Sequence, residues 1–265
     1  MDSNYTKNNY DTPVNYKTML GDTLCLKTRF FFFSRIINTV LRFAKNIKKG
    51  KYSTEEWCRE SYYNFDTVEG CGGKIHLKNL NNISAVSGPV VFIANHMSIM
   101  ETFLLPGLIL PKKPITFVVK QSLLDMPRFG VVMRATKAIP ICRHDPIKDF
   151  KTVMTEGTKR LKAGTSVVIF PQNTRGAQFN PEKFNSIGTK LAKRTGVPII
   201  PIALKTDFWK NGKLIKNFGP LNRKKDIYIE FGTPITVEGN GKKEHAKIVN
   251  FIQSRLNEWG GISLN

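Results

Sequence analysis

Two short polar segments follow apolar runs and combine residue types suited to acid–base chemistry and anion binding. In the first, Asn95 and His96 follow the apolar run 88–94, and Glu101 lies about one helical turn further on. A carboxylate beside an imidazole fixes its tautomer and stabilises the imidazolium, so the imidazole can take a proton from a hydroxyl group. The spacing therefore predicts a His96–Glu101 pair that acts as a general base.

The same segment also has a purely structural interpretation. Ser98 and Glu101 have the spacing of a capping box, in which the carboxylate accepts hydrogen bonds from backbone N–H groups at the start of a helix. The two interpretations are compatible, because a carboxylate at a helix N-terminus stays ionised and can still face His96.

The second segment is residues 170–176, with the sequence FPQNTRG. Arg175 is suited to bidentate contact with a phosphate or carboxylate group, and Gln172, Asn173 and Thr174 surround it with amide and hydroxyl groups. The alternative interpretation is a surface loop with a solvated arginine.

Two further cationic residues, Lys120 and Arg143, each follow another apolar run. Taken singly, each is more typical of an ordinary surface charge. If the runs are neighbouring strands, both residues join Arg175 in one cationic site.

The hydrophobic pattern predicts the elements that position these residues. Apolar segments of strand length are expected at 74–80, 88–96, 115–120, 137–142, 166–171, 197–204 and 226–232. Helical segments are expected at 97–110, 147–164, 186–196 and 242–259. This alternation predicts an α/β fold with a largely parallel central sheet and flanking helices. Ligands of such sheets bind beyond the carboxyl ends of the strands, where His96 and Arg175 fall.

The N-terminal part of the chain has a different composition. Residues 1–17 are rich in Asn, Tyr, Asp and Lys without periodicity, which predicts a disordered tail. Residues 18–65 are expected to form an amphipathic helical segment, with a second helix starting at Ser53 or Thr54. The α/β domain is then expected to span residues 66–265.

A helical wheel of residues 30–49 separates apolar from basic side chains. The apolar side carries Phe30, Phe33, Ile36, Ile37, Val40, Leu41, Phe43, Ala44 and Ile47, and the opposite side carries Arg35, Asn38, Arg42, Lys45, Asn46 and Lys49. Phe31 falls among the polar residues. A basic amphipathic helix rich in Phe is typical of a helix lying at a membrane surface. The alternative is a helix packed on its own domain.

Composition narrows the classes of partner. The 265 residues include 41 Lys and Arg against 20 Asp and Glu, a net charge of +21 that favours an anionic partner. Nucleic acid is not favoured, because the sequence lacks zinc-finger spacing, a helix-turn-helix and an RNP-like aromatic motif. No apolar run reaches the roughly 18 residues of a membrane-spanning helix. Scattered cysteines and a polar start without a secretory signal favour a reducing, cytoplasmic location and predict no metal site.

Together the polar segments resemble the lysophospholipid (glycerolipid) acyltransferase family typified by 1-acylglycerol-3-phosphate acyltransferase. The resemblance covers roughly residues 70–235 and keeps the sequence blocks of the family in order. Residues 95–101 match the first block, normally NHx4D, and Lys120 through Gly130 to Arg143 match the second. Residues 170–175 resemble the third, usually FPEGTR, and residues 197–201 match the fourth, an apolar strand with two prolines.

The resemblance implies a reaction. His96, oriented by Glu101, would deprotonate the hydroxyl of a lysophospholipid, most simply 1-acylglycerol 3-phosphate, which then attacks an acyl thioester directly. Acyl-CoA or an acyl carrier protein would deliver the chain, with no metal and no bound cofactor. Lys120, Arg143 and Arg175 would hold the phosphate of the acceptor, and Thr174 or nearby amides would steady the oxyanion. A peripheral enzyme on the cytoplasmic side of an anionic membrane is expected.

Departures from the family pattern leave the acceptor open. Glu101 replaces the usual Asp, as it does in the related lipid A acyltransferases. Gln172 and Asn173 replace Glu and Gly in the third block, which removes a negative charge; Asn tolerates left-handed backbone angles better than most residues. The alternatives are another acceptor, such as glycerol 3-phosphate or a lyso-ornithine lipid, and a catalytically silent lipid-binding relative.

Overall fold

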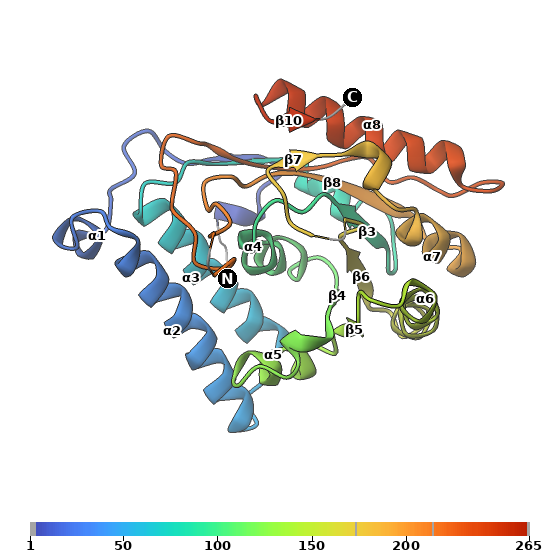
Figure 1. Ribbon diagram of the computed structural model, residues 1–265, viewed down its shortest axis with the longest axis horizontal. Coiled ribbons are helices and arrows are strands. Elements are labelled where there is room, and N and C mark those ends of the chain that lie inside the picture. The colour runs from blue at the N-terminus through green and yellow to red at the C-terminus, as the bar shows by residue number, and fades with distance from the viewer. Residues whose placement is uncertain (1–3, 173, 214, 264–265) are drawn as a thin grey trace.

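The computed structural model describes residues 4–172, 174–213 and 215–263 and is built around an eight-stranded sheet (Figure 1). Its strands are β1 (Tyr10–Asp11), β2 (Ile75–Lys78), β3 (Val91–Ala94), β4 (Ile115–Lys120), β5 (Ile139–Ile141), β6 (Ser166–Ile169), β8 (Ile199–Lys205) and β9 (Ile227–Phe231). Across the sheet they lie in the order β1-β2-β9-β8-β3-β6-β4-β5. A separate parallel pair joins β7 (Gln178–Phe179) to β10 (Ile262–Ser263).

Most neighbouring strands run parallel. The central strand β3 pairs in parallel with β6 on one side and with β8 on the other. Strand β4 is parallel to β5 and β6, and β2 is parallel to β9. Only two pairs within the eight-stranded sheet, β1–β2 and β8–β9, are antiparallel. The predicted fold class, a largely parallel sheet with flanking helices, is confirmed.

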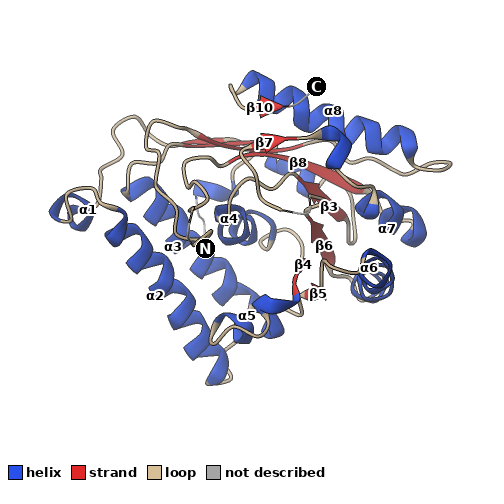
Figure 2. Cartoon of the chain, in the orientation of Figure 1, coloured by secondary structure: helices blue, strands red, loops and turns tan. Residues whose placement is uncertain are grey.

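Helices cover both faces of the sheet (Figure 2). One face carries α6 (Pro146–Lys162), α7 (Ile187–Thr195) and α8 (Lys242–Glu258). The other carries α3 (Thr54–Gly70) and α4 (Met100–Ile109), with α2 (Arg29–Lys48) packed on α3 and on α5 (Phe129–Ala135). The short elements are α1 (Leu20–Leu24), η1 (Asn4–Thr6), η2 (Leu80–Ile83), η3 (Gln121–Leu123) and η4 (Pro181–Lys183).

Strand β3 is buried on both faces because helices cover both sides of the sheet. Its side chains alternate: Phe92 and Ala94 pack into the core under α3 and α4, while Val91 and Ile93 pack into the core under α6 to α8. Such a strand needs an apolar residue at every position, which explains the uninterrupted run before His96. His96 therefore follows a fully buried strand at the centre of the sheet.

Local signals fix several helix ends. The Ser53 hydroxyl accepts a hydrogen bond from the Glu56 amide at 3.1 Å and starts α3. Asp145 does the same for the Lys148 amide at 2.9 Å at the start of α6. Helix α7 ends at Gly196, whose φ of +69° is a left-handed conformation that glycine adopts without strain.

The expected disordered tail is wrong for the described part of residues 1–17. Tyr5 stacks on Phe65 with ring centroids 4.4 Å apart, and its hydroxyl donates to a carboxylate oxygen of Glu69 at 2.6 Å. Tyr10 donates to the other oxygen of Glu69 at 2.7 Å, and strand β1 pairs with β2. The segment is ordered because its tyrosines satisfy a buried carboxylate; residues 1–3 lie outside the described residues.

Helix α2 forms as predicted, but its buried side is turned relative to the wheel. Phe32 is fully buried against Trp209, with ring centroids 5.0 Å apart, whereas Phe30 is 77% exposed. The reason is that α3 and the chain around Trp209 contact the side of α2 that carries Phe32 and Phe33. The helix thus belongs to the core of the α/β domain.

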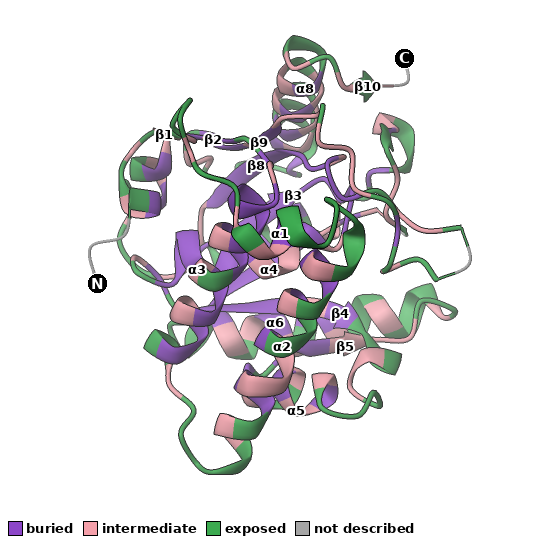
Figure 3. Cartoon of the chain, turned by 90° about the vertical axis from the view of Figure 1, so that its left-hand side faces the viewer, coloured by how far each residue is buried: buried purple, intermediate pink, exposed green. Residues whose placement is uncertain are grey.

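Several other apolar residues of α1, of α2 and of the turn between them are exposed, and Figure 3 colours much of α1 as exposed. Leu20, Leu24 and Leu26 are 73%, 72% and 85% exposed, and Ile37 is 42% exposed. Among the described residues, none of the helices has both the length and the apolar character needed to cross a bilayer.

Candidate active site

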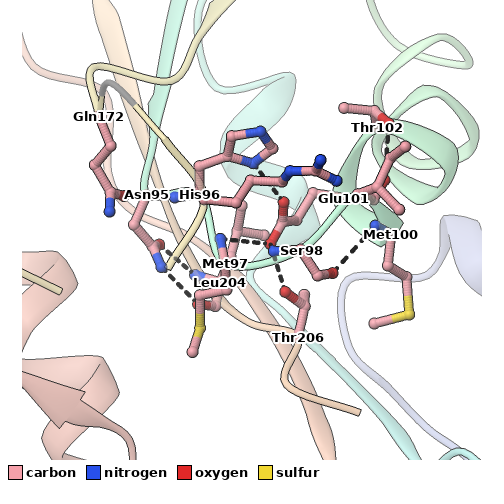
Figure 4. A network of polar contacts seen from close by, with 12 residues as sticks. Asn95, His96, Met97, Ser98, Met100, Glu101, Thr102, Gln172, Leu204 and Thr206 are labelled. Atoms are coloured by element: carbon pink, nitrogen blue, oxygen red, sulfur yellow. Dashed lines mark hydrogen bonds and ion pairs between the residues drawn. The ribbon is translucent and has the colours of Figure 1, made fainter. Parts of the chain in front are cut away.

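The predicted pair of His96 and Glu101 is assembled where β3 ends and α4 begins (Figure 4). Nδ1 of His96 lies 2.6 Å from Oε2 of Glu101, and the carboxylate has no exposed surface. The contact holds the imidazole in one orientation and leaves Nε2 for other partners. A neutral His96 then carries its proton on Nδ1 and presents Nε2 as a base.

The second carboxylate oxygen of Glu101 explains why this buried acid is tolerated. Oε1 accepts hydrogen bonds from the backbone amides of Met97 at 2.9 Å and Ser98 at 2.8 Å, and from the hydroxyl of Thr206. The capping and acid–base interpretations therefore hold together, since each oxygen of Glu101 serves one of them. Buried charges need this degree of hydrogen bonding to be stable.

Neighbouring residues fix the backbone and ring of His96. The side chain of Asn95 pairs with the backbone of Leu204 in β8, donating to its carbonyl at 2.7 Å and accepting from its amide at 2.8 Å. The His96 ring stacks on Phe170 with ring centroids 4.2 Å apart. Gln172 accepts the His96 amide through Oε1 at 2.6 Å.

This last contact changes the role expected of Gln172. Its side-chain oxygen holds the backbone of His96, so the structure gives Gln172 a positioning contact in addition to the expected place beside the acceptor. An amide oxygen accepts this hydrogen bond as a carboxylate would, which explains how Gln replaces the Glu usual in the family. Asn173, also expected at the site, lies outside the described residues.

His96 borders a cavity of about 360 Å³ that is mostly apolar. Its apolar walls come from α2, α3, α5 and β4, and include Phe43, Trp57, Phe117, Val119, Val132 and Met133. An interior of this kind accommodates a hydrocarbon chain.

Cationic residues line the same cavity beside His96. Lys120 ends β4, Arg143 follows β5, and Arg175 follows β6, as the strand-end rule predicted. Partial burial lowers the pKa of Arg143 and of Arg175 from their usual values, and in Arg175 the neighbouring Arg143 lowers it further. Cations placed this close together favour a bound anion.

Sequence reasoning missed part of the cationic site. Lys216 also lines the cavity, and its ammonium donates to the hydroxyl of Thr174. Asn217 accepts a hydrogen bond from Nη2 of Arg175 at 2.6 Å. These residues lie in an irregular segment without periodicity, so no local signal marks them. Thr206 had a signal, because it lies two residues after the predicted apolar strand 197–204.

Thr174 was expected to bind substrate or steady an oxyanion. The structure places its hydroxyl against the ammonium of Lys216, from which it accepts a hydrogen bond. The structure thus places four of the predicted residues around one cavity, His96, Lys120, Arg143 and Arg175, with Glu101 buried in contact with His96.

Comparison with known proteins places this geometry in a family. The family model described as Acyltransferase matches residues 74–205. A 1-acyl-sn-glycerol-3-phosphate acyltransferase of Pseudomonas aeruginosa is 31% identical over 248 residues, which are 93% of this chain and 89% of that protein. The chain belongs to the acyltransferase family. The apolar cavity beside the histidine of this acyltransferase is therefore a candidate site for an acyl chain.

Other relatives are more distant. This acyltransferase is 29% identical to the chloroplastic 1-acyl-sn-glycerol-3-phosphate acyltransferase LPAT1 of Arabidopsis thaliana over 131 residues, 49% of the chain and 36% of the plant protein. The crystal structure of the 1-acyl-sn-glycerophosphate acyltransferase PlsC from Thermotoga maritima superposes with a TM-score of 0.62 at 16% identity, covering 90% of this chain and 91% of that one. That likeness establishes the shared fold.

Proposed function

We propose that this acyltransferase transfers a fatty acyl group from a thioester to the free hydroxyl of 1-acylglycerol 3-phosphate in phospholipid biosynthesis. The observation that carries the proposal is the 2.6 Å contact between His96 and the buried Glu101, at a point where an apolar cavity meets a group of cations. Relatives named 1-acyl-sn-glycerol-3-phosphate acyltransferases support the choice of acceptor.

The chemistry follows from the orientation of His96. Nε2 takes the proton of the acceptor hydroxyl as its oxygen attacks the thioester carbonyl, and Glu101 stabilises the imidazolium that forms. The tetrahedral intermediate then expels the thiolate, which takes the proton back from His96. The acyl group moves in one displacement, so no acyl-enzyme is needed.

The cations bind the phosphate of the acceptor. Arg143 and Arg175 make charge-assisted hydrogen bonds to its oxygens, and Lys120 adds positive charge from the end of β4. Fixing the phosphate beside His96 places the glycerol hydroxyl within reach of Nε2. Binding energy remote from the reacting atoms thus orients the hydroxyl for attack.

The acyl donor is a thioester of coenzyme A or of an acyl carrier protein, and its chain occupies the apolar cavity. Phe117, Val119 and Val132 provide uncharged walls. A hydrocarbon chain that packs against them is removed from water, which is favourable. We expect no resident metal or cofactor, because the thioester supplies the activated carbonyl.

The outward-facing side chains of α1 and α2 dock the enzyme peripherally on an anionic membrane. Leu20, Leu24, Leu26 and Phe30 provide an apolar surface for the interface, and Lys45, Lys48 and Lys49 add charges that attract anionic headgroups. The lipid acceptor then reaches the site without passing through water. Since thioester donors are made in the cytoplasm, we place the enzyme on that side of the membrane.

A panel of acceptors tests this function. Purified protein is mixed with vesicles containing lysophosphatidic acid, lysophosphatidylglycerol, lyso-ornithine lipid or glycerol 3-phosphate, with acyl-CoA or acyl carrier protein as donor. Products are identified by mass spectrometry, with the His96→Ala variant as the blank. Phosphatidic acid as the main product is the expected result. Preference for another acceptor would reassign the substrate, and no product from any acceptor would indicate a silent lipid-binding protein.

A further inference from the structure

The loop that follows β8 has a defined conformation, held by hydrogen bonds between its two arms. Its two arms are joined by hydrogen bonds from the Asn222 amide to the Phe208 carbonyl at 2.7 Å and from the Lys210 amide to the Pro220 carbonyl at 3.1 Å. Gly219 is required at the crossing, because a Cβ there would overlap the carbonyl of Lys210. The arms are residues 206–213 and 215–222, hereafter the β8–β9 loop.

The β8–β9 loop is anchored to the site on one side and to α2 on the other. Asn211 donates to the carbonyl of Met97, the residue after His96, at 2.9 Å. Trp209 packs edge-on against Phe32 of α2, and its indole donates to the carbonyl of Asn217 at 3.1 Å. The loop therefore holds its tip at a defined place relative to His96.

At this tip, the β8–β9 loop adds a cation and an orienting group to the cavity. Lys216 reaches the hydroxyl of Thr174 while lining the cavity, and the side chain of Asn217 holds one nitrogen of Arg175. The other terminal nitrogen of Arg175, Nη1, is buried without a hydrogen-bond partner among the described residues. A buried guanidinium nitrogen without a partner needs an acceptor oxygen from a ligand.

We propose that Lys216 and the oriented Arg175 make the site selective for acceptors that end in a phosphate monoester over acceptors in which the phosphate is a diester. The proposal rests on the proposed function and specifies which chemical feature of the lysolipid is recognised. Asn217 acts as a positioning residue through Arg175.

Charge decides between the two kinds of acceptor. A phosphate monoester has a second pKa near about 6, so at neutral pH it carries close to two negative charges and three terminal oxygens. A diester carries one charge and has a substituent on one of those oxygens. Arg143, Arg175 and Lys216 together match the dianion, and a diester leaves one of them without a full counter-charge.

Lys216 lies close to other positive charges of the cavity. Partial burial lowers the pKa of Lys216, and the nearby Arg175 and Arg143 lower it further. A dianion offsets the repulsion among these three cations more than a monoanion does, so it gains more from Lys216. Lys216 therefore contributes more to binding the monoester than to binding the diester.

The test compares acceptor preference in substituted enzymes. Lys216→Met removes the charge and keeps the length of the side chain, Lys216→Arg keeps the charge, and Lys210→Met is the control at an exposed lysine of the same loop outside the cavity. Each variant is assayed with lysophosphatidic acid as monoester and lysophosphatidylglycerol as diester, at fixed acyl-CoA. KM for the acyl donor is measured separately.

We expect Lys216→Met to raise KM for lysophosphatidic acid about tenfold and to lower its preference over lysophosphatidylglycerol by a similar factor. The donor KM should stay within about twofold, and Lys216→Arg should restore most of the preference. Equal losses with both acceptors, or an unchanged preference, would overturn this selectivity. A wild-type enzyme that acylates neither acceptor would instead reject the proposed function, so the two failures are distinguishable.

Discussion

The imidazole of His96 and the carboxylate of Glu101 meet at 2.6 Å, although the histidine belongs to the end of a strand and the acid to the first turn of a helix. Glu is one methylene longer than the Asp usual in the family. Its second oxygen reaches back to the amides of Met97 and Ser98, so the longer side chain is held in place. The pair is thus rigid before substrate binds.

Replacing His96 should remove the chemical step. His96→Ala eliminates the base, and we expect kcat to fall by about 10²–10⁴-fold or more. The measurement is the initial rate of phosphatidic acid formation. His76→Ala is the control, because His76 pairs with Asp11 at the outer strands of the sheet. Unchanged turnover in His96→Ala would exclude the general-base role.

Glu101→Gln separates charge from shape. The amide keeps the size of the side chain and an oxygen that accepts the backbone amides, but it no longer stabilises an imidazolium. We expect kcat to fall by about 10²–10⁴-fold with little change in either KM. Melting curves serve as the control for folding. A loss of activity that parallels a loss of the folded state would show that Glu101 acts mainly as a helix cap.

Arg175→Ala tests the phosphate contact. Its loss should raise KM for lysophosphatidic acid about tenfold or more and leave KM for acyl-CoA within about twofold. The matched control is Arg194→Ala, an exposed arginine of α7 on the opposite side of the sheet. If both KM values rise equally, Arg175 does not serve the acceptor phosphate.

Gln172→Leu tests whether the side chain positions His96 or binds the acceptor. Leucine leaves the His96 amide without an acceptor, which costs roughly 1–3 kcal/mol and disturbs the histidine. We therefore expect kcat to fall while KM for the acceptor changes little, and Gln172→Glu to retain activity. If the main effect of Gln172→Leu is a rise in KM for the acceptor, Gln172 acts mainly by binding the acceptor.

Membrane docking is tested at side chains and not by truncation, because Phe32 and Phe33 of α2 are buried in the core. A combined Leu20→Ser, Leu24→Ser and Phe30→Ser variant should lower the partition coefficient onto anionic vesicles, measured by sedimentation, by about 10³-fold or more, since burying each such side chain stabilises by about 1.5–3 kcal/mol. Ile147→Ser, on α6 across the sheet and 70% exposed, is the control. Equal pelleting of all variants would contradict docking through α1 and α2.

The sequence predicted the elements around the site well, for a physical reason. A central parallel strand is buried on both faces, so β3, β4, β6 and β8 stand out as apolar runs. Their carboxyl ends share one edge of the sheet, and the rule that ligands bind there found His96, Arg143 and Arg175 together.

Contacts that depend on distant partners were not predictable. The polar composition of residues 4–12 suggests disorder, but Glu69, more than fifty residues later, accepts hydrogen bonds from three of its side chains, and β2 pairs with β1. Likewise, a helical wheel of α2 uses hydropathy alone. It cannot show that Phe32 is the residue that Trp209 covers, because Trp209 is distant in the sequence. Lys216 has no local pattern at all and joins the site only because its loop folds back.

Trp209 gives this molecule a natural optical probe. It is one of three tryptophans, with Trp57 on the wall of the cavity and Trp259 stacked on Tyr228 far from it. Trp209 is buried, with 3% of its surface exposed. Its indole N–H donates a hydrogen bond to Asn217, whose side chain accepts a hydrogen bond from Arg175. With phenylalanine at the other two positions, its fluorescence emission should report occupancy of the site in real time, without a label on the lipid.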